Sequence, residues 1–338
     1  IGVTGTNGKT TTTWMVYSIL REKFGEKVGV MSTIGWGWGD QIEDQTAHAT
    51  TESPEVLQRH LARMREAGVE YVVIEVSSHA LAQHRVFGIL FDAAVFTNLS
   101  PDHLDYHKTM TKYREAKERL FHLAANNRNG KRLGIINGDD PAGRFFASDI
   151  PIAIRYGLRN DDNDLSAQHV KLSANAIEYD LNVSTVFAKN LANDNFKNRK
   201  SLSLHIKTHL PGEFNVYNSL AAVAIGLEYN LSGAEIVRGL ANLRSVPGRM
   251  NTVEGGQGFT AIIDYATTPD AFAYVLPGIR RAIKAHVIRA FGLPGQRAQT
   301  TEADMGVVSA KYPAVTILIA DDSRGRLRAQ AHKLAAGI

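Results

Sequence analysis

Short, continuous apolar runs alternate with helical stretches over the first 140 residues, and this alternation restricts the fold more than any other feature. The clearest runs are Val28–Met31, Tyr71–Val76, Ala93–Thr97 and Leu133–Asn137. Continuous apolar strands are typical of a parallel sheet that is buried on both faces. Helical spacing of apolar residues predicts helices between these runs, at residues 12–24, 54–67 and 111–125. The chain is therefore predicted to form an α/β domain with a mostly parallel, doubly wound sheet.

The pattern changes after residue 168. Alternating apolar positions around 183–187 and 202–206 predict a small antiparallel sheet, and the glycines of Gly35–Gly39 predict a loop. Helices are expected at 214–229 and 233–243, followed by a break at Val246–Arg249 and by strands near 260–264, 286–291 and 315–319. We predict a central domain over residues 1–246 and a smaller, Rossmann-like α/β domain over 247–338.

Composition excludes several classes of function. The chain has no cysteine, so disulfides, Cys-ligated zinc, iron–sulfur clusters and a thiol nucleophile are ruled out. Its 38 basic and 34 acidic residues are dispersed, which does not favour a nucleic-acid partner. No run of about 18 apolar residues and no signal peptide is found. We therefore expect no membrane span and a cytoplasmic location, whereas the oligomeric state is left open.

A phosphate-binding loop is predicted at the start of the chain. Its residues are Gly5, Thr6, Asn7, Gly8, Lys9, Thr10 and Thr11, between a strand stub and a predicted helix. Glycines let backbone N–H groups approach phosphates, and the helix N-terminus adds positive potential. Lys9 would reach the terminal phosphates and the Thr10 hydroxyl would bind Mg²⁺. The spacing departs from the strict pattern because Val3 stands at the first glycine position. The alternative is a glycine turn at a helix start.

Acidic and histidine side chains follow two of the predicted strands. Glu75 ends an apolar strand, where α/β sheets bind ligands, so Thr10 and Glu75 together suggest a magnesium–ATP site. A salt-bridged acid is the alternative for Glu75. The segment Asp102–His107 contains two acids and two histidines, which suit either a second metal or a polar surface loop. On spacing alone, Lys117 is an ordinary solvated lysine.

Taken together, these segments resemble the Mur ligase family, which joins amino acids to peptidoglycan precursors with ATP. The segments that carry the resemblance, in family order, are Gly5–Thr11, Thr50–Thr51, Glu75–Leu81, Gln83–Arg85, Phe96–His107, Tyr113–Lys117, Phe214–Asn218 and Val246–Met250. The match is closest to the members that add the third amino acid of the peptide. The occurrence of all these segments in one chain and in this order is highly specific for the family.

The resemblance implies roles for individual residues. Lys117 matches a lysine that the family carbamylates, and its carbamate would hold a second Mg²⁺ with Glu75 and His103. Residues expected to hold the UDP-MurNAc-peptide are Thr50, Thr51, Ser77, Gln83 and Arg85. Those expected at the adenine and phosphates of ATP are Asn215, Asn218, Arg249 and Asp264. The implied cofactors are thus ATP, two Mg²⁺ ions and a carbamylated lysine, and the implied second substrate is a free amino acid. In the implied reaction, a substrate carboxylate forms an acyl phosphate with ATP, which the amino group then attacks.

The chain departs from the family at both ends. The N-terminal domain that holds the UDP end is absent, and the C-terminal domain is expected to be incomplete, so we expect a piece of a larger protein. Thr267 replaces a family histidine, and Glu302 replaces an arginine that contacts the incoming amino acid in diaminopimelate-adding members. The family motif Asp-Asn-Pro-Arg appears as Asp322-Ser323-Arg324. Glu302, Asp322 and Arg324 are therefore expected at an unusual amino-acid site.

Three interpretations follow. The chain is a ligase that adds an unusual third amino acid, such as one with a second cation for Glu302. Alternatively, it is an amide ligase for another acid, like folylpolyglutamate and cyanophycin synthetases. The third interpretation is a nucleotide-binding protein that has lost ligation. The combination of Lys9, Glu75, His103 and Lys117 favours an enzyme.

Overall fold

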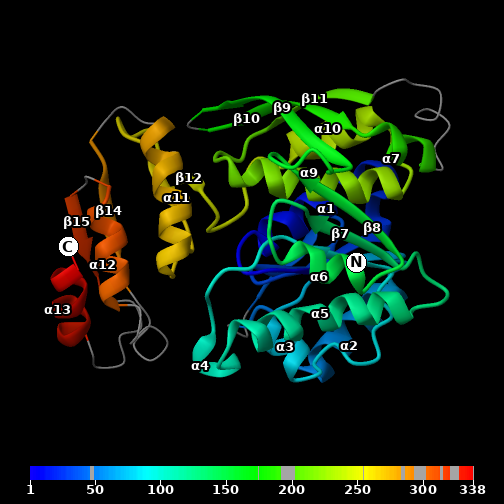
Figure 1. Cartoon of the computed structure of the whole chain (residues 1–338), viewed down its shortest axis with the longest axis horizontal. Helices are drawn as coiled ribbons and strands as arrows, with labels where there is room; N and C mark the ends of the chain where they lie inside the picture. The colour runs from blue at the N-terminus through cyan, green and yellow to red at the C-terminus, as the bar shows by residue number, and fades with distance from the viewer. Residues whose placement is uncertain are drawn as a thin grey trace.

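The computed structural model describes residues 1–45, 49–173, 175–191, 202–253, 255–282, 286–292, 302–312, 315–319 and 327–337. A large α/β domain is followed by a smaller C-terminal domain, seen in orange and red in Figure 1. No helix in these ranges is both long and apolar enough to cross a membrane.

One sheet organises the large domain. Its strand order in the described residues is β11-β10-β9-β8-β7-β6-β1-β5-β2-β3-β4. The parallel part consists of β1 (Gly2–Thr4), β2 (Val28–Met31), β5 (Tyr71–Glu75), β6 (Ala93–Phe96), β7 (Leu133–Asn137) and β8 (Ile152–Gly157). One antiparallel edge is β9 (Leu165–Leu172), β10 (Ile177–Val183) and β11 (Leu202–Thr208), and the other is β3 (Gly35–Trp38) and β4 (Gln41–Asp44). Because β8 pairs in parallel with β9, the predicted small antiparallel sheet is an extension of the parallel sheet.

Helices cover both faces of this sheet. The helices α1 (Lys9–Phe24), α9 (Phe214–Glu228) and α10 (Gly233–Asn242) share one apolar core with the strands. The opposite core includes residues of α2 (Pro54–Glu66), α3 (Ser78–Ala82), α5 (Met110–Asn126) and α6 (Gly143–Ser148). Shorter elements are η1 (Gly25–Lys27), α4 (Leu104–His107) and α7 (Thr185–Asn190). The predicted doubly wound domain is thus confirmed.

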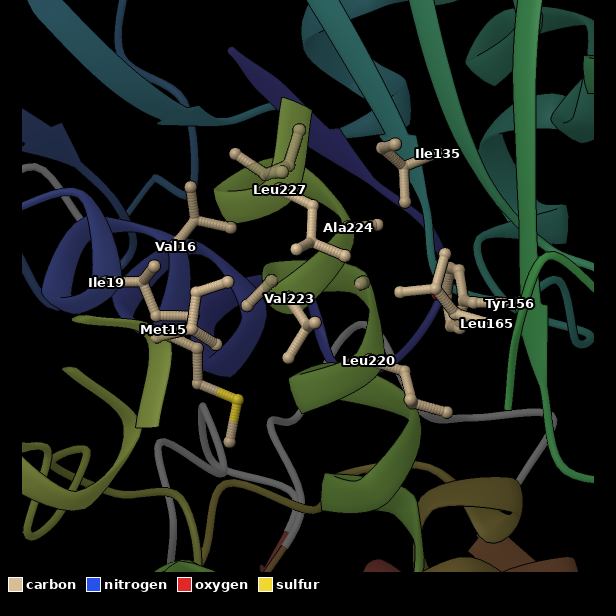
Figure 2. Packing of buried hydrophobic residues seen from close by; sticks show 14 of the residues in the cluster. Met15, Val16, Ile19, Ile135, Tyr156, Leu165, Leu220, Val223, Ala224 and Leu227 are labelled. Carbon is tan, nitrogen blue, oxygen red and sulfur yellow. The ribbon is translucent and has the colours of Figure 1, made fainter. Parts of the chain in front are cut away.

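Helix α9 is buried on nearly all sides. It packs beside α1 and against strands β7, β8 and β9, and Figure 2 shows part of this packing. The labelled side chains of α9 are Leu220, Val223, Ala224 and Leu227, and they lie between Met15, Val16 and Ile19 of α1 and the strand residues Ile135, Tyr156 and Leu165. A helix that is apolar all round is expected in such a position. Since α1 begins at the predicted phosphate loop, this packing fixes that loop relative to the sheet.

Two local predictions are wrong. The predicted loop at 35–39 is largely strand β3, in which Trp36 is buried and stacks on the His60 ring at a centroid distance of 3.5 Å. A Cβ at Gly37 would lie 1.9 Å from the Gln41 carbonyl oxygen. This glycine therefore allows β3 and β4 to pair closely and does not mark a turn. Residues 185–187 are helical in α7 because the Ser184 hydroxyl caps the helix by accepting from the Phe187 amide.

The C-terminal domain is smaller. Its strands are β12 (Asn251–Val253), β13 (Ala261–Ile263), β14 (Ile288–Phe291) and β15 (Val315–Leu318), and its helices are α11 (Pro269–Ala282), α12 (Glu302–Ala310) and α13 (Leu327–Gly337). Strands β12 and β13 pair antiparallel, and β14 and β15 pair in parallel. The turn at Val246–Arg249, in which Gly248 has a φ of 68°, leads into this domain.

Candidate active site

The carboxyl ends of three neighbouring strands meet at one edge of the sheet. Strand β1 lies between β5 and β6 and is parallel to both, so the chain order changes direction here. Ligands bind at such switch points in α/β sheets. The loop Gly5–Gly8 follows β1, Glu75 ends β5, and Thr97–Asn98 follows β6. The fold therefore brings the separate sequence motifs together.

The phosphate loop is held by side chains that follow β6. Asn98 brackets Asn7: its Oδ1 accepts from the Asn7 amide and its Nδ2 donates to the Asn7 carbonyl, both at 2.9 Å. Gly8 has a φ of 86°, and a Cβ there would lie 2.4 Å from the Asn218 Oδ1. A side chain would also collide at Gly5, 1.9 Å from the Thr97 Oγ1. The glycines are needed for this close approach.

Two lysines converge on this loop. Lys9 Nζ donates to the carbonyls of Gly5 and Thr6 at 3.1 and 2.8 Å, and Lys117 Nζ donates to the Gly5 carbonyl at 2.7 Å. Lys117 is only 1% exposed, so the solvated lysine suggested by its spacing is wrong. Burial, and next the charge of Lys9, hold the pKa of Lys117 well below its ordinary value. Burial also lowers the pKa of Lys9.

The Glu75 carboxylate lies beside the N-terminus of α1. Its Oε1 accepts from the Thr10 hydroxyl at 3.1 Å, and its Oε2 accepts from both the amide and the hydroxyl of Thr33 at 2.9 Å. Glu75 is 2% exposed. Sequence analysis missed Thr33, which lies in a turn with no recognisable motif.

The donor set at Thr10 and Glu75 fits a magnesium ion. Hydroxyl and carboxylate oxygens are hard ligands, and Mg²⁺ usually takes its remaining ligands from phosphate and water. The described residues contain no group of three His, Asp or Glu side chains able to hold a metal by themselves. Near Lys117 the donors differ: His103 Nε2 is 3.5 Å from Asp102 Oδ2, and burial lowers the pKa of His103. The Lys117 amine could contribute oxygen ligands only after carbamylation.

The residues predicted to hold the peptide substrate form one polar cluster. Thr51 Oγ1 donates to the Glu75 carbonyl at 2.9 Å and accepts from the Ser77 amide at 3.0 Å. Arg85 donates from Nη1 to the Thr51 carbonyl at 2.8 Å and from Nε to Gln83 Oε1 at 2.9 Å. Thr50 precedes Thr51 in the chain. The cluster adjoins the strand end that carries Glu75.

A pocket between the two domains opens next to the phosphate loop. Its lining includes Asn7, Gly8, Thr11, Asn98, Asn137, Asn218, Arg249, Asp264 and the aromatic residues Phe214, Tyr217, Tyr265 and Tyr274. Asn215 lies behind Asn218 and accepts from its Nδ2 at 2.8 Å. Sequence analysis missed most of the aromatic walls, because these residues come from separate helices and no short motif joins them.

The C-terminal domain reaches the phosphate loop through one turn. Arg249 Nη2 donates to the Thr10 hydroxyl at 3.0 Å, and the Arg249 guanidinium lies 5.0 Å from the centre of the Tyr265 ring. Asp264 Oδ2 accepts from the Met250 amide at 2.8 Å and so fixes this turn. Burial raises the pKa of Asp264, and the Met250 amide opposes this. The structure thus places Arg249 and Asp264 in the lining of this pocket.

The residues predicted to contact the incoming amino acid are only partly described. Glu302 begins α12 and is fully buried, with its Oε2 3.3 Å from Lys333 Nζ of α13. Asp322 and Arg324 lie outside the described residues. Their role in amino-acid binding therefore stays a prediction.

The fold and this site define a two-domain, phosphate-loop α/β protein. Models of two domain families match it: the Mur ligase middle domain over residues 3–226 and the Mur ligase, glutamate ligase domain over residues 248–338. The chain belongs to the Mur ligase family.

Named relatives agree with this assignment. The UDP-N-acetylmuramoyl-L-alanyl-D-glutamate–2,6-diaminopimelate ligase of Geobacillus thermodenitrificans is 40% identical over 330 residues, which cover 96% of this chain and 63% of that protein. Diaminopimelate ligase 1 of Clostridium acetobutylicum is 38% identical over 327 residues, which cover 96% of this chain and 62% of that protein. The chain thus spans a little under two thirds of the length of these relatives.

Solved structures show the same fold. A diaminopimelate ligase structure of this type has a TM-score of 0.68 and 27% identity, covering 100% of this chain and 65% of its own. Folylpolyglutamate synthase of Mycobacterium tuberculosis, complexed with ADP, has a TM-score of 0.72 but only 14% identity, covering 100% of this chain and 78% of its own. This second likeness shows the fold alone.

Proposed function

We propose that this chain provides the central and C-terminal domains of an ATP-dependent ligase. The ligase joins an amino acid to the carboxylate of a UDP-MurNAc-dipeptide in peptidoglycan precursor synthesis. The observation that carries this proposal is the pair of Thr10 and Glu75 oxygens 3.1 Å apart, beside a fixed phosphate loop that Arg249 reaches from the other domain. The substrate is supported by the similar ligases of Geobacillus thermodenitrificans and Clostridium acetobutylicum, which are named for UDP-N-acetylmuramoyl-L-alanyl-D-glutamate. Because ATP and UDP-linked precursors are cytoplasmic, we propose the same location for the protein.

ATP would bind with its base in the aromatic pocket and its phosphates on the loop amides. Thr10 and Glu75 would hold one Mg²⁺, and His103 with a Lys117 carbamate would help to hold a second. Such ions neutralise the charge that builds up on a transferred phosphoryl group. Lys9 and Arg249 add fixed positive charge beside the same loop, because their side chains already contact it.

The reaction would proceed in two displacements. A carboxylate oxygen of the dipeptide attacks the γ-phosphorus, its bond to phosphorus forms, and the bond to the bridging oxygen breaks to release ADP. The amino group then attacks the acyl carbon of the acyl phosphate, and phosphate leaves as the amide forms and the nitrogen loses a proton. The Thr51–Ser77–Arg85 cluster would orient the dipeptide, so the protein contributes positioning and electrostatics.

The burial of Lys117 supports carbamylation. A neutral amine attacks CO₂, a nitrogen–carbon bond forms, and one proton leaves to give an anionic carbamate. Burial and the charge of Lys9 both favour the neutral amine. The modification would replace the buried amine with oxygen ligands.

Diaminopimelate is the first candidate for the added amino acid, because the similar relatives are named for it. We further propose that Glu302, Asp322 and Arg324 contribute to the amino-acid site and adapt its specificity. Glu302 would act through the arrangement of α12 and α13, since its carboxylate pairs with Lys333 inside the domain.

The test is phosphate release from ATP by the full-length protein. UDP-MurNAc-dipeptide is supplied with each of twenty amino acids, diaminopimelate or ornithine. Release that requires both the dipeptide and one amino acid is expected. ATP binding without any amino-acid dependence would contradict the proposal and favour a nucleotide-binding protein without ligase activity.

A further inference from the structure

The turn between β2 and β3 lies outside the segments on which the sequence analysis based the family resemblance, yet it contacts the proposed metal ligand directly. Thr33 donates two hydrogen bonds of 2.9 Å to Glu75 Oε2, one from its amide and one from its hydroxyl. The other carboxylate oxygen, Oε1, accepts from Thr10. Both oxygens of this buried carboxylate are therefore held, Oε1 by Thr10 at the start of α1 and Oε2 by Thr33 in the turn after β2.

Helix α1 also fixes this turn. Trp14 Nε1 donates to the Ser32 hydroxyl at 3.0 Å, and that hydroxyl donates to the Gly35 carbonyl at 3.1 Å. The Ser32 amide donates to the same carbonyl at 2.9 Å. Since α1 begins with Lys9 and Thr10, one helix positions both the Thr10 hydroxyl and the turn that holds the opposite side of Glu75.

We propose that Thr33 is a positioning residue for the divalent cation of this site. A carboxylate on a free side chain rotates, whereas two bonds to Oε2 keep Oε1 directed toward Thr10 and the phosphate loop. Partners of this kind hold metal ligands in orientation, and their loss typically weakens metal affinity by about 10- to 100-fold. The inference rests on the proposed function, because that function supplies the cation.

The hydroxyl of Thr33 can be removed while the branched shape of the side chain is kept. Thr33→Val keeps the branched side chain and the amide bond to Glu75 but removes the hydroxyl bond. Thr33→Ser keeps the hydroxyl. Thr13→Val is a matched control, because the buried Thr13 hydroxyl has no hydrogen-bond partner within the described residues. Thr33→Ala gives a second variant that lacks the hydroxyl.

The experiment measures Mn²⁺ binding by electron paramagnetic resonance. The full-length protein is titrated in the presence of a non-hydrolysable ATP analogue and without dipeptide or amino acid. We expect Thr33→Val and Thr33→Ala to weaken Mn²⁺ binding by about tenfold or more, while Thr33→Ser and Thr13→Val bind as the wild type does. Thermal unfolding of each variant is measured in parallel to confirm that it is folded.

Two results would overturn the inference: Mn²⁺ affinity of Thr33→Val and Thr33→Ala equal to that of Thr13→Val, or no Mn²⁺ binding by the wild type. Failure of the proposed function gives a different pattern. In that case the wild type binds Mn²⁺ and nucleotide, and loses Mn²⁺ affinity with Thr33→Val, but releases no phosphate with any amino acid.

Discussion

The central and C-terminal domains contribute to the same pocket in different ways. The central domain has extensive apolar cores on both faces of its sheet, and its phosphate loop is held by Asn98, which follows β6, and by Lys117 of α5. In the described part of the C-terminal domain, the core cluster is small, consisting of Phe272, Leu276, Phe291, Met305 and Leu334. Large apolar side chains there are exposed, including Phe259 at 71% and Ile288 at 70%.

The two domains therefore differ in what they contribute: the central domain shapes the phosphate loop, and the C-terminal domain adds side chains beside it. Every described contact that shapes the phosphate loop, except that of Arg249, comes from the central domain. The C-terminal domain adds Arg249 and aromatic walls through elements that follow one turn. Substitutions in the central domain should therefore abolish phosphoryl transfer, whereas substitutions in the C-terminal domain should reduce its rate or alter the amino-acid step.

The largest effect is expected for Lys9→Ala. Lys9 is half-buried at the loop beside the proposed path of the phosphoryl group, and loss of one such stabilising group typically costs about 100- to 1,000-fold in kcat. Overall ligation is measured by phosphate release in the presence of dipeptide and amino acid, with thermal unfolding as a folding control. Activity within tenfold of the wild type would remove Lys9 from the mechanism.

Lys117→Ala should lower kcat by about 100-fold, because the variant lacks the oxygen ligands of the carbamate. Added short-chain carboxylates such as formate or acetate should restore part of the activity by providing an oxygen anion. Rescue is measured as phosphate release against carboxylate concentration, and Lys9→Ala is the control that should not respond. A Lys117→Ala enzyme that formate does not rescue would count against the carbamate.

Arg249→Ala tests the contribution of the C-terminal domain to the phosphate site. Loss of a charge-assisted contact of about 1.5 kcal/mol corresponds to roughly a tenfold drop in kcat, a smaller effect than at Lys9. Arg249→Lys should recover part of it. The kcat of both variants is measured by steady-state kinetics. A loss of kcat in Arg249→Ala as large as that in Lys9→Ala would contradict the proposed difference between the two domains.

Glu302→Gln should change the KM for the amino acid by a few-fold and leave the KM for ATP unchanged. The expected cause is altered pairing with Lys333, which joins α12 to α13. The amino-acid panel is repeated with this variant. A shift in thermal unfolding without any change in amino-acid preference would assign Glu302 a structural role alone.

The smallest effect concerns acid stability of the central domain. Burial, and next the charges of His79 and Lys117, lower the pKa of His107 to about 4. The His107 imidazole therefore stays neutral in the folded state, whereas in the unfolded state it binds a proton below the ordinary histidine pKa of 6.5. Stability is lost as pH falls from 6.5 toward 4. His107→Gln should show a shallower fall in Tm over this window, and an equally steep fall would exclude His107 as a cause.

Local pattern predicted much of the fold but misjudged segments whose structure depends on neighbours. The apolar runs near Val28, Tyr71, Ala93 and Leu133 all form parallel strands, because a strand buried on both faces requires a continuous apolar sequence. The glycines of 35–39 indicate a loop by themselves, yet pairing with β2 and β4 makes the segment a strand. Tertiary context overrides such short-range signals.

Some residues of the candidate site can likewise be identified from local sequence, whereas others cannot. Lys9, Thr10 and Glu75 can be identified from the sequence, because a loop between a strand and a helix and an acid at a strand end have direct chemical meaning. Spacing alone makes Lys117 a solvated residue, and its role is expected only from the family resemblance. Thr33 carries no motif at all.

The sequence by itself therefore determined the class of fold, the phosphate loop and the family, since these depend on hydrophobic periodicity and on residues close together in the chain. Only the tertiary structure decided that Lys117 is buried against Gly5, that Thr33 holds Glu75 and that Arg249 reaches Thr10. Each of these contacts joins residues far apart in sequence. Their pairing depends on strand order and on helix packing across the sheet, which no local pattern specifies.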